Sequence, residues 1–189
     1  MTSATPTRGR PRSSDRTEAI LDAAHDVLKE HGFDNVRMQD IADQACAGLA
    51  TIYRRWDTRE ALLADAIASR PAIEYEPVGD PRTDLAGLTR AMAEEMNERA
   101  HLMASFISAA RAHDDVGAAL RDKIAAQIRV AYADYLGEIL GQDSPHLALL
   151  ADLVPGVVMV RAGMMDEQID PDELAADVLA LVDHLAAAG

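Results

Sequence analysis

The sequence has little cysteine and few aromatic residues. Among 189 residues it contains one cysteine, Cys46, one tryptophan, two phenylalanines and four tyrosines. A single cysteine excludes a disulfide within the chain, and we interpret Cys46 as a small buried residue. Strands favour clusters of β-branched and aromatic side chains, and these are mostly absent, whereas alanine and leucine are abundant. The composition therefore predicts packed helices rather than sheets.

A long apolar run without charge is also lacking. The longest candidate, 153–165, is interrupted by Pro155, Gly156 and Arg161, whereas a membrane-spanning helix needs about 20 predominantly apolar residues. We therefore expect a buried helix there and no membrane association. The arginines near the N-terminus are not followed by an apolar segment, so no secretory signal is predicted. We expect a cytoplasmic protein.

Motifs for catalysis and metal binding are missing as well. The sequence has no glycine-rich phosphate loop, no nucleophile elbow and no close pair of metal-binding histidines, and nothing links Cys46 to a histidine base. We therefore predict no catalytic residues, no metal site and no cofactor.

The negative charge is unevenly distributed. The net charge is −14, yet residues 1–60 carry nine Lys/Arg against ten Asp/Glu, and residues 61–189 carry nine against twenty-two. Four arginines occur in the first sixteen residues, against Asp15 alone. A phosphate backbone would repel the acidic part, so this polarity favours a DNA-binding protein that docks with its N-terminal part.

Breaker residues divide the chain into four predicted segments. Residues 1–13 lack an apolar period and form a basic arm, which we expect to be disordered. Helical periodicity over 14–69 predicts a DNA-binding domain, and Pro71, Pro77, Gly79 and Pro81 place a linker at 70–82. Residues 83–189 form a second helical domain, with helices expected at about 83–99, 101–112, 115–140, 144–165 and 171–187.

Residues 38–56 have the length and arrangement of a helix-turn-helix, in which the second helix enters the major groove of DNA. At about 100° per residue, Trp56 lies on the side of Ile52, whereas Ala50 and Arg54 point the opposite way. Arg54 is suited to guanine, Ala50 and Thr51 to a thymine methyl, and Tyr53 and Arg55 to phosphates. On these residues alone, an ordinary amphipathic hairpin is an equal alternative.

Four stretches then resemble the N-terminal domain of the TetR family of transcriptional regulators. They are GRPR at 9–12, ILDAAHDVLKEHGF at 20–33, MQDIADQA at 38–45 and TIYRRWDTREALLADAI at 51–67. EPVGDPRTDL at 76–85 and the Pro155-Gly156 pair resemble a C-terminal subgroup common in actinobacteria. The resemblance implies an all-α fold of about nine helices with a three-helix DNA-binding head, and a homodimer formed through the last two helices. It also implies a repressor that a small molecule releases from a palindromic operator on double-stranded DNA.

The turn departs from the family pattern. The family usually has Gly-Val-Ser-Lys where this chain has Cys46-Ala47-Gly48-Leu49. Gly48 is a weaker helix cap than serine, and Leu49 replaces a cation that often helps to hold DNA. Arg37 stands where a capping threonine is common, and it adds a phosphate contact.

The N-terminal arm supplies a second signal for DNA binding. Arg8-Gly9-Arg10-Pro11 resembles the core of an AT-hook, whose arginines lie in a narrow minor groove; a solvated tail is an equal alternative. The predicted DNA-facing set comprises Arg8, Arg10, Arg12, Arg37, Gln39, Leu49, Ala50, Thr51, Tyr53, Arg54, Arg55 and Arg59.

The C-terminal part supplies candidates for a dimer interface and an effector pocket. A helical stripe on the last helix, together with Val157, predicts the interface: Val157, Leu174, Val178, Leu181 and Leu185. Flexible methionines suit a pocket for a largely apolar effector, which gives the set Met92, Met96, Met103, Phe106, Met159, Arg161 and Met164. Ordinary core packing is the alternative for the methionines, and an ion pair of Arg161 with Asp152 or Glu95 is the alternative for that residue.

Two other functions remain open. One is an enzyme, which the missing motifs disfavour. The other is a TetR-like dimer whose altered turn has lost operator binding and which acts through a protein partner. A DNA-binding assay over a range of salt separates these readings, because only a true regulator keeps specific affinity above its salt-sensitive background.

Overall fold

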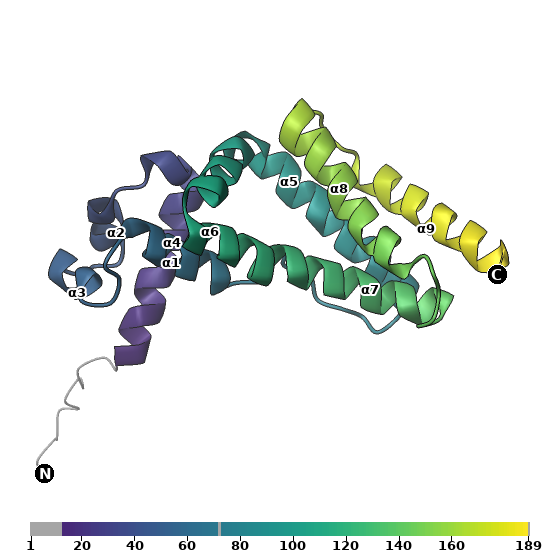
Figure 1. Cartoon of the computed structure of the whole chain (residues 1–189), viewed down its shortest axis with the longest axis horizontal. Coiled ribbons are helices and arrows are strands. Elements are labelled where there is room, and N and C mark those ends of the chain that lie inside the picture. The colour runs from purple at the N-terminus through teal and green to yellow at the C-terminus, as the bar shows by residue number, and fades with distance from the viewer. Residues whose placement is uncertain (1–12, 72, 189) are drawn as a thin grey trace, which may run out of the picture.

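The computed structural model describes residues 13–71 and 73–188, and every regular element within these ranges is helical (Figure 1). The all-α expectation is therefore confirmed. The described residues form nine α-helices with a 3₁₀ turn, η1, and a π-helical stretch, η2. In chain order the elements are α1 (Ser13–His31), η1 (Phe33–Asn35), α2 (Met38–Gln44), α3 (Leu49–Tyr53), α4 (Arg59–Ala68), α5 (Pro81–Ala112), α6 (Asp114–Ala119), η2 (Leu120–Ala125), α7 (Ala126–Leu140), α8 (Leu147–Met165) and α9 (Pro171–Ala188).

The N-terminal helices α1 to α4 pack around one apolar core. Six positions at helical spacing predict the first helix, and Gly32 predicts its end. Five of the six are buried in this core, namely Ile20, Ala23, Ala24, Val27 and Leu28, whereas His31 is exposed. The helix ends at His31 because Gly32 adopts a φ of 71°, which a residue without Cβ reaches at little cost. The spacing of Asp57 and Glu60 is that of a capping box and predicts Asp57 as the cap of α4, but this prediction is wrong. Thr58 is the cap, and its side chain accepts a hydrogen bond from the backbone N–H of Ala61 at 3.1 Å.

Helix α5 runs unbroken from Pro81 to Ala112, so the expected break at Arg99-Ala100 is wrong. Neither residue breaks a helix, and Arg99 forms an ion pair with Glu95 one turn earlier, which supports a continuous helix. The helix begins where Asp80 accepts a hydrogen bond from the Thr83 N–H and Pro81 occupies the first turn.

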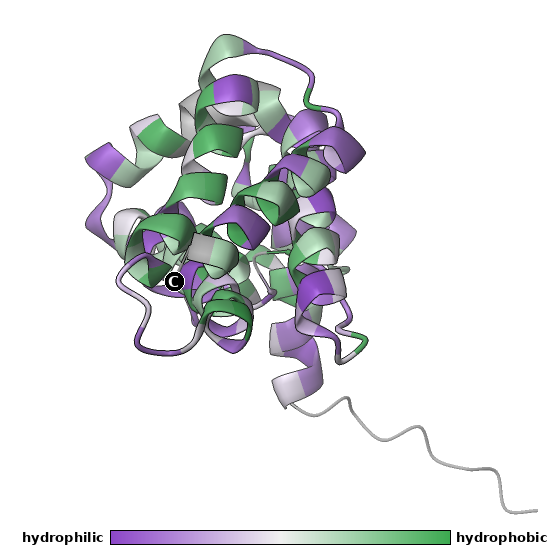
Figure 2. Ribbon diagram, turned by 90° about the vertical axis from the view of Figure 1, so that its right-hand side faces the viewer, coloured by the Kyte–Doolittle hydropathy of each residue, from purple (hydrophilic) through white to green (hydrophobic). Residues whose placement is uncertain are grey.

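Helix α5 also connects the two apolar cores of the molecule. Near its start, Leu85 and Met92 belong to a core shared with α7, α8 and α9. Near its end, Ala109 joins Val116 of α6 in the N-terminal core. Most helices carry both hydrophobic and hydrophilic residues, as two-faced helices do (Figure 2). The division into domains at 14–69 and 83–189 stays a prediction.

Helices α8 and α9 pack on α5 and α7 at the end of the molecule far from α3 (Figure 1). By length and composition, α8 is the one helix in the described ranges that is apolar enough to cross a membrane. The expectation that it is a buried helix holds for one face only. That face includes Leu150, Val154 and Val158, whereas Leu149 and Met164 are 67% and 72% exposed.

Candidate DNA interface and effector cavity

The turn between α2 and α3 is held by backbone hydrogen bonds. The N–H groups of Ala45 and Ala47 donate to the carbonyls of Ile41 and Ala42, each at 2.9 Å. Cys46 adopts a φ of 48°, in the left-handed region, and its side chain is exposed. Our interpretation of Cys46 as a buried residue is therefore wrong, because the turn directs this position toward solvent. Gly48 is the cap of α3 and provides no side-chain hydrogen bond.

The orientation of α3 agrees with the sequence prediction. Ile52 is fully buried and Trp56 is 6% exposed, so both anchor the segment to the core. The indole N–H of Trp56 also donates to Asp65 Oδ2 of α4 at 2.8 Å. On the opposite side, Ala50 and Arg54 are exposed, and Tyr53 is 48% exposed. An exposed face that carries a guanidinium, a phenol and a methyl group thus lies at one end of the molecule.

Two further arginines of the predicted set make contacts within the protein. Arg55 donates from Nε to Thr17 Oγ1 at 3.2 Å and from Nη1 to the Thr51 carbonyl at 3.1 Å, and so joins the end of α3 to α1. Arg59 donates from Nη1 to the Val36 carbonyl at 3.1 Å, and its guanidinium carbon lies 5.2 Å from the centre of the Phe33 ring. Both side chains therefore position α3 and α4 relative to neighbouring elements.

The other predicted DNA-facing residues lie in varied surroundings. Gln39 is exposed on α2 and donates to Asp43 Oδ1 at 2.7 Å. Arg37 is exposed at the cap of α2 and makes no capping hydrogen bond. Thr51 is half-buried, and Leu49 packs partly against the N-terminal core. The arginines of the arm fall outside the described residues: Arg8, Arg10 and Arg12.

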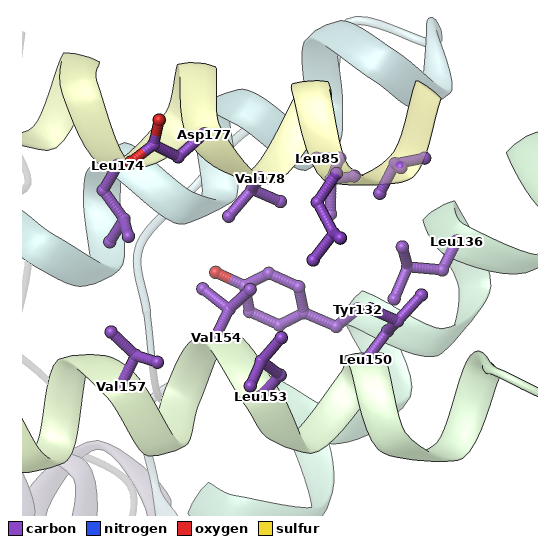
Figure 3. Close-up of a pocket in the computed structure, with 12 residues that line it drawn as sticks. Leu85, Tyr132, Leu136, Leu150, Leu153, Val154, Val157, Leu174, Asp177 and Val178 are labelled. Atoms are coloured by element: carbon purple, nitrogen blue, oxygen red, sulfur yellow. The ribbon is translucent and has the colours of Figure 1, made fainter. Parts of the chain in front are cut away.

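A second candidate site is an apolar cavity of about 160 Å³ between α8 and α9 (Figure 3). Tyr132 of α7 lies at its centre, and its hydroxyl donates to Thr89 Oγ1 at 3.2 Å. Burial raises the pKa of Tyr132 to about 12, so the phenol keeps its proton. Asp177 supplies the carboxylate of the lining. The lining residues are Leu85, Tyr132, Leu136, Leu150, Leu153, Val154, Val157, Leu174, Asp177, Val178, Leu181 and Val182.

Of the seven predicted effector residues, the five whose side chains the structure describes do not line this cavity. Met92 is buried in the core beside Tyr132, Met96 and Met159 are half-buried, and Met164 is exposed. The side chains of Met103 and Phe106 fall outside the described part of the structure.

Arg161 makes a different ion pair from those expected. Its guanidinium Nη2 lies 2.6 Å from Glu167 Oε1, and this contact lowers the pKa of the Glu167 carboxyl. The expected pairing with Asp152 or Glu95 is wrong, because these carboxylates pair with Arg129 and Arg99.

The predicted dimer residues lie around the same cavity. Val157, Leu174, Val178 and Leu181 line it, and Leu185 is half-buried one turn further along α9. Leu174 and Val178 are 8% and 9% exposed, whereas Leu181 is 39% exposed. The apolar stripe of α9 thus begins in the core and continues to the surface.

Comparisons with known proteins decide the family. The model for bacterial regulatory proteins of the tetR family matches residues 20–66, from within α1 into α4. The uncharacterized HTH-type transcriptional regulator Rv1556 of Mycobacterium tuberculosis is 31% identical over 169 residues, which cover 83% of this chain and 80% of that protein. The chain belongs to the TetR family. It is therefore a transcriptional regulator with a DNA-binding helix-turn-helix, formed by α2 and α3.

Other TetR-type proteins match over the head or the whole fold. YdeS of Bacillus subtilis is 44% identical over 73 residues, which span 36% of that protein. The crystal structure of the TetR family regulator SCO0332 superposes with a TM-score of 0.68 at 26% identity, and it covers 89% of this chain and 97% of its own. These relatives are regulators rather than enzymes.

Proposed function

We propose that this TetR family member is a repressor that binds a palindromic operator as a homodimer and leaves it when a small, largely apolar molecule binds. The observation that carries the proposal is the outward face of α3. Ile52 and Trp56 fix the inner side of this segment, and Ala50, Tyr53 and Arg54 are left exposed.

In this proposal Arg54 reads a base and its neighbours position the helix. A guanidinium forms two hydrogen bonds with the major-groove edge of guanine, and a small apolar group fits a thymine methyl. Ala50 and Thr51 supply that apolar contact, and Tyr53 reaches a phosphate. At the edge of the interface lie Gln39, Arg37 and Leu49, and the arginines of the arm at 1–13 add positive charge to DNA binding. Arg55 and Arg59 contribute positive charge there, mainly by holding α3 and α4 in place.

The exposed apolar face of α8 and α9 supports dimerisation. Leu149, Leu153, Val160 and Leu181 are between 39% and 67% exposed, and a second copy of the chain would cover them. A four-helix interface built from α8 and α9 of each protomer would place two copies of α3 on the same side of DNA. Two recognition helices about 34–36 Å apart read half-sites one turn apart.

The cavity between α8 and α9 supports an effector role. Its lining is apolar apart from Tyr132 and Asp177, so it suits an apolar molecule with one hydrogen-bonding group. Because the cavity lies within the proposed dimer interface, a bound molecule would change the packing of α8 against α9 and thereby the separation of the two heads. The bound molecule would therefore weaken DNA binding by a coupling free energy. Bound DNA would weaken effector binding by the same free energy.

The test is selection of bound sequences from a random duplex pool by the purified protein at near-physiological salt. An enriched palindrome is the expected result, and it would supply an operator for effector screening. If a folded, dimeric protein enriches nothing, the proposal fails and the alternative of a partner-binding protein gains support.

A further inference from the structure

Three segments that are distant in sequence bring their charged side chains together away from both sites above. They are the second half of α1, the connection after α4, and the middle of α5. The side chains enclose a small cavity of about 100 Å³. Its lining residues are His25, Lys29, Arg70, Pro71, Glu74, Glu95 and Arg99.

Two nitrogen atoms in this cluster lack hydrogen bonds. Among the side chains that the structure describes, His25 Nδ1 and Arg99 Nε are buried and make no hydrogen bond. Such groups are rare, because an unpaired buried donor loses its interactions with water without replacement. Arg99 uses its Nη1 for Glu95 and leaves Nε unpaired. Both residues line the cavity, and they come from different helices, His25 from α1 and Arg99 from α5.

Charged side chains of both signs line the cavity. Lys29, Arg70 and Arg99 face two carboxylates, Glu74 and Glu95, and Glu95 is neutralised by its ion pair with Arg99. On α1, the carboxylates of Asp22 and Asp26 lie 3.0 and 3.9 Å from Arg70 Nη2, and Asp26 Oδ1 lies 3.8 Å from His25 Nδ1. The charges of the whole cluster therefore nearly balance.

Burial shifts the ionisation of both unpaired groups. Burial, followed by the charges of Arg70 and Arg99, lowers the pKa of His25, although Asp26 opposes this. Burial also lowers the pKa of Arg99.

We propose that this cavity binds a small oxyanion, the carboxylate or phosphate group of an acidic molecule, between Arg99 and His25. An oxyanion accepts hydrogen bonds from both unpaired nitrogens, and a charge-assisted bond such as that from the Arg99 guanidinium is short and strong. The volume suits one such group rather than a whole large ligand. The site is distinct from the cavity between α8 and α9, which is apolar and lies in the core that α5 shares with α7, α8 and α9.

The site also joins the DNA-binding head to the long helix that leads to the dimer region. Its groups come from α1, which packs on α2 and α4, and from α5, which packs on α8 and α9. A bound oxyanion would fix α1 against α5 and thereby change the affinity for operator DNA. This consequence rests on the proposed function, whereas anion binding does not, so the two can fail separately.

The test is a proton NMR titration of the histidine C2–H resonances of the full-length protein, with His25→Gln to assign the signal of His25. Inorganic phosphate and acetate are added in separate series, with chloride adjusted to hold ionic strength constant. We expect a saturable shift of the His25 signal with one or both anions, and a rise in the pKa of His25 when the anion is bound. Saturation by phosphate alone assigns the site to phosphate groups, and saturation by acetate alone assigns it to carboxylates.

Two variants locate the site. Arg99→Gln should weaken anion binding about tenfold or more, since a charged hydrogen-bond donor is lost. Arg90→Gln is the matched control on the same helix, because Arg90 pairs with the exposed Asp172, and it should leave the titration unchanged. Arg99→Lys, which keeps the charge and lacks Nε, replaces Arg99→Gln if thermal unfolding shows that the latter is not folded. The proposal is overturned if neither anion gives a saturable shift, or if the Arg99 variants bind as wild type does.

Discussion

Replacing Cys46 by glycine should stabilise the protein. Cys46 adopts a left-handed φ of 48° with an exposed side chain, and this conformation costs an L-residue roughly 1–2 kcal/mol. Glycine avoids that cost but loses roughly 0.5–1 kcal/mol more conformational entropy on folding than a residue with a side chain. Because no packing of the exposed thiol is lost, the middle of each range gives a net gain of about 0.75 kcal/mol. For a chain of this size the midpoint of thermal unfolding should rise by about 1–4 °C.

The assay is thermal unfolding followed by circular dichroism, at one protein concentration because dimerisation also shifts the midpoint. Cys46→Ala is the matched control, since it removes the thiol and keeps the Cβ that causes the strain, and its midpoint should stay close to that of wild type. The reasoning is refuted if Cys46→Gly fails to raise the midpoint, or if Cys46→Ala raises it equally.

Three further predictions concern other parts of the molecule. Arg59→Lys should lower the free energy of unfolding by about 1–3 kcal/mol through loss of the carbonyl hydrogen bond and the contact with Phe33; unchanged stability in denaturant unfolding would contradict the positioning role. His25 has a pKa below its usual 6.5 in the folded state, so the unfolded state binds its proton more tightly and stability falls as the pH drops below about 6.5. His25→Gln should flatten this fall in unfolding curves between pH 7 and 5, and an equal slope would count against it. Leu181→Asp should yield monomers in sedimentation velocity while Ala176→Asp, on the opposite side of α9, stays dimeric; two dimeric variants would argue against the proposed interface.

The elements that could be predicted from the sequence are those with strong local signals. Gly32 ended α1 as expected, the segment around the turn at 45–48 folded as two short helices, and the alternation of Ile52 with Arg54 fixed which side of α3 is buried. The helix boundary expected at Arg99-Ala100, where the sequence has no helix-breaking residue, was wrong. Arg99-Ala100 continues a helix as readily as it ends one, so only tertiary packing shows that α5 is continuous.

The cavity and the ion pairs could not be predicted for a different reason. Leucines that line the cavity have the same chemistry as leucines that only fill the core, and no sequence signal separates Leu150, which lines the cavity, from Leu88, which does not. Arg161 finds Glu167 because Asp166 adopts a left-handed conformation and turns the chain back beside the end of α8. The burial of Cys46 was expected from residue preference, but the backbone of the turn decided its exposure. The spacing of residues therefore predicted which face of a helix is buried, but it did not predict which side chains pair between elements.

The most direct test of the central claim, that the outer face of α3 reads DNA, compares wild type with Arg54→Ala on the duplex enriched by selection. Fluorescence anisotropy would give affinities for that duplex and for an unrelated one at several salt concentrations. We predict that Arg54→Ala lowers the ratio of specific to non-specific affinity by about tenfold, the effect of losing one bidentate base contact of about 1–3 kcal/mol. Arg129→Gln, which removes an exposed charge on α7, should leave the ratio unchanged. An unchanged ratio in Arg54→Ala would contradict the account.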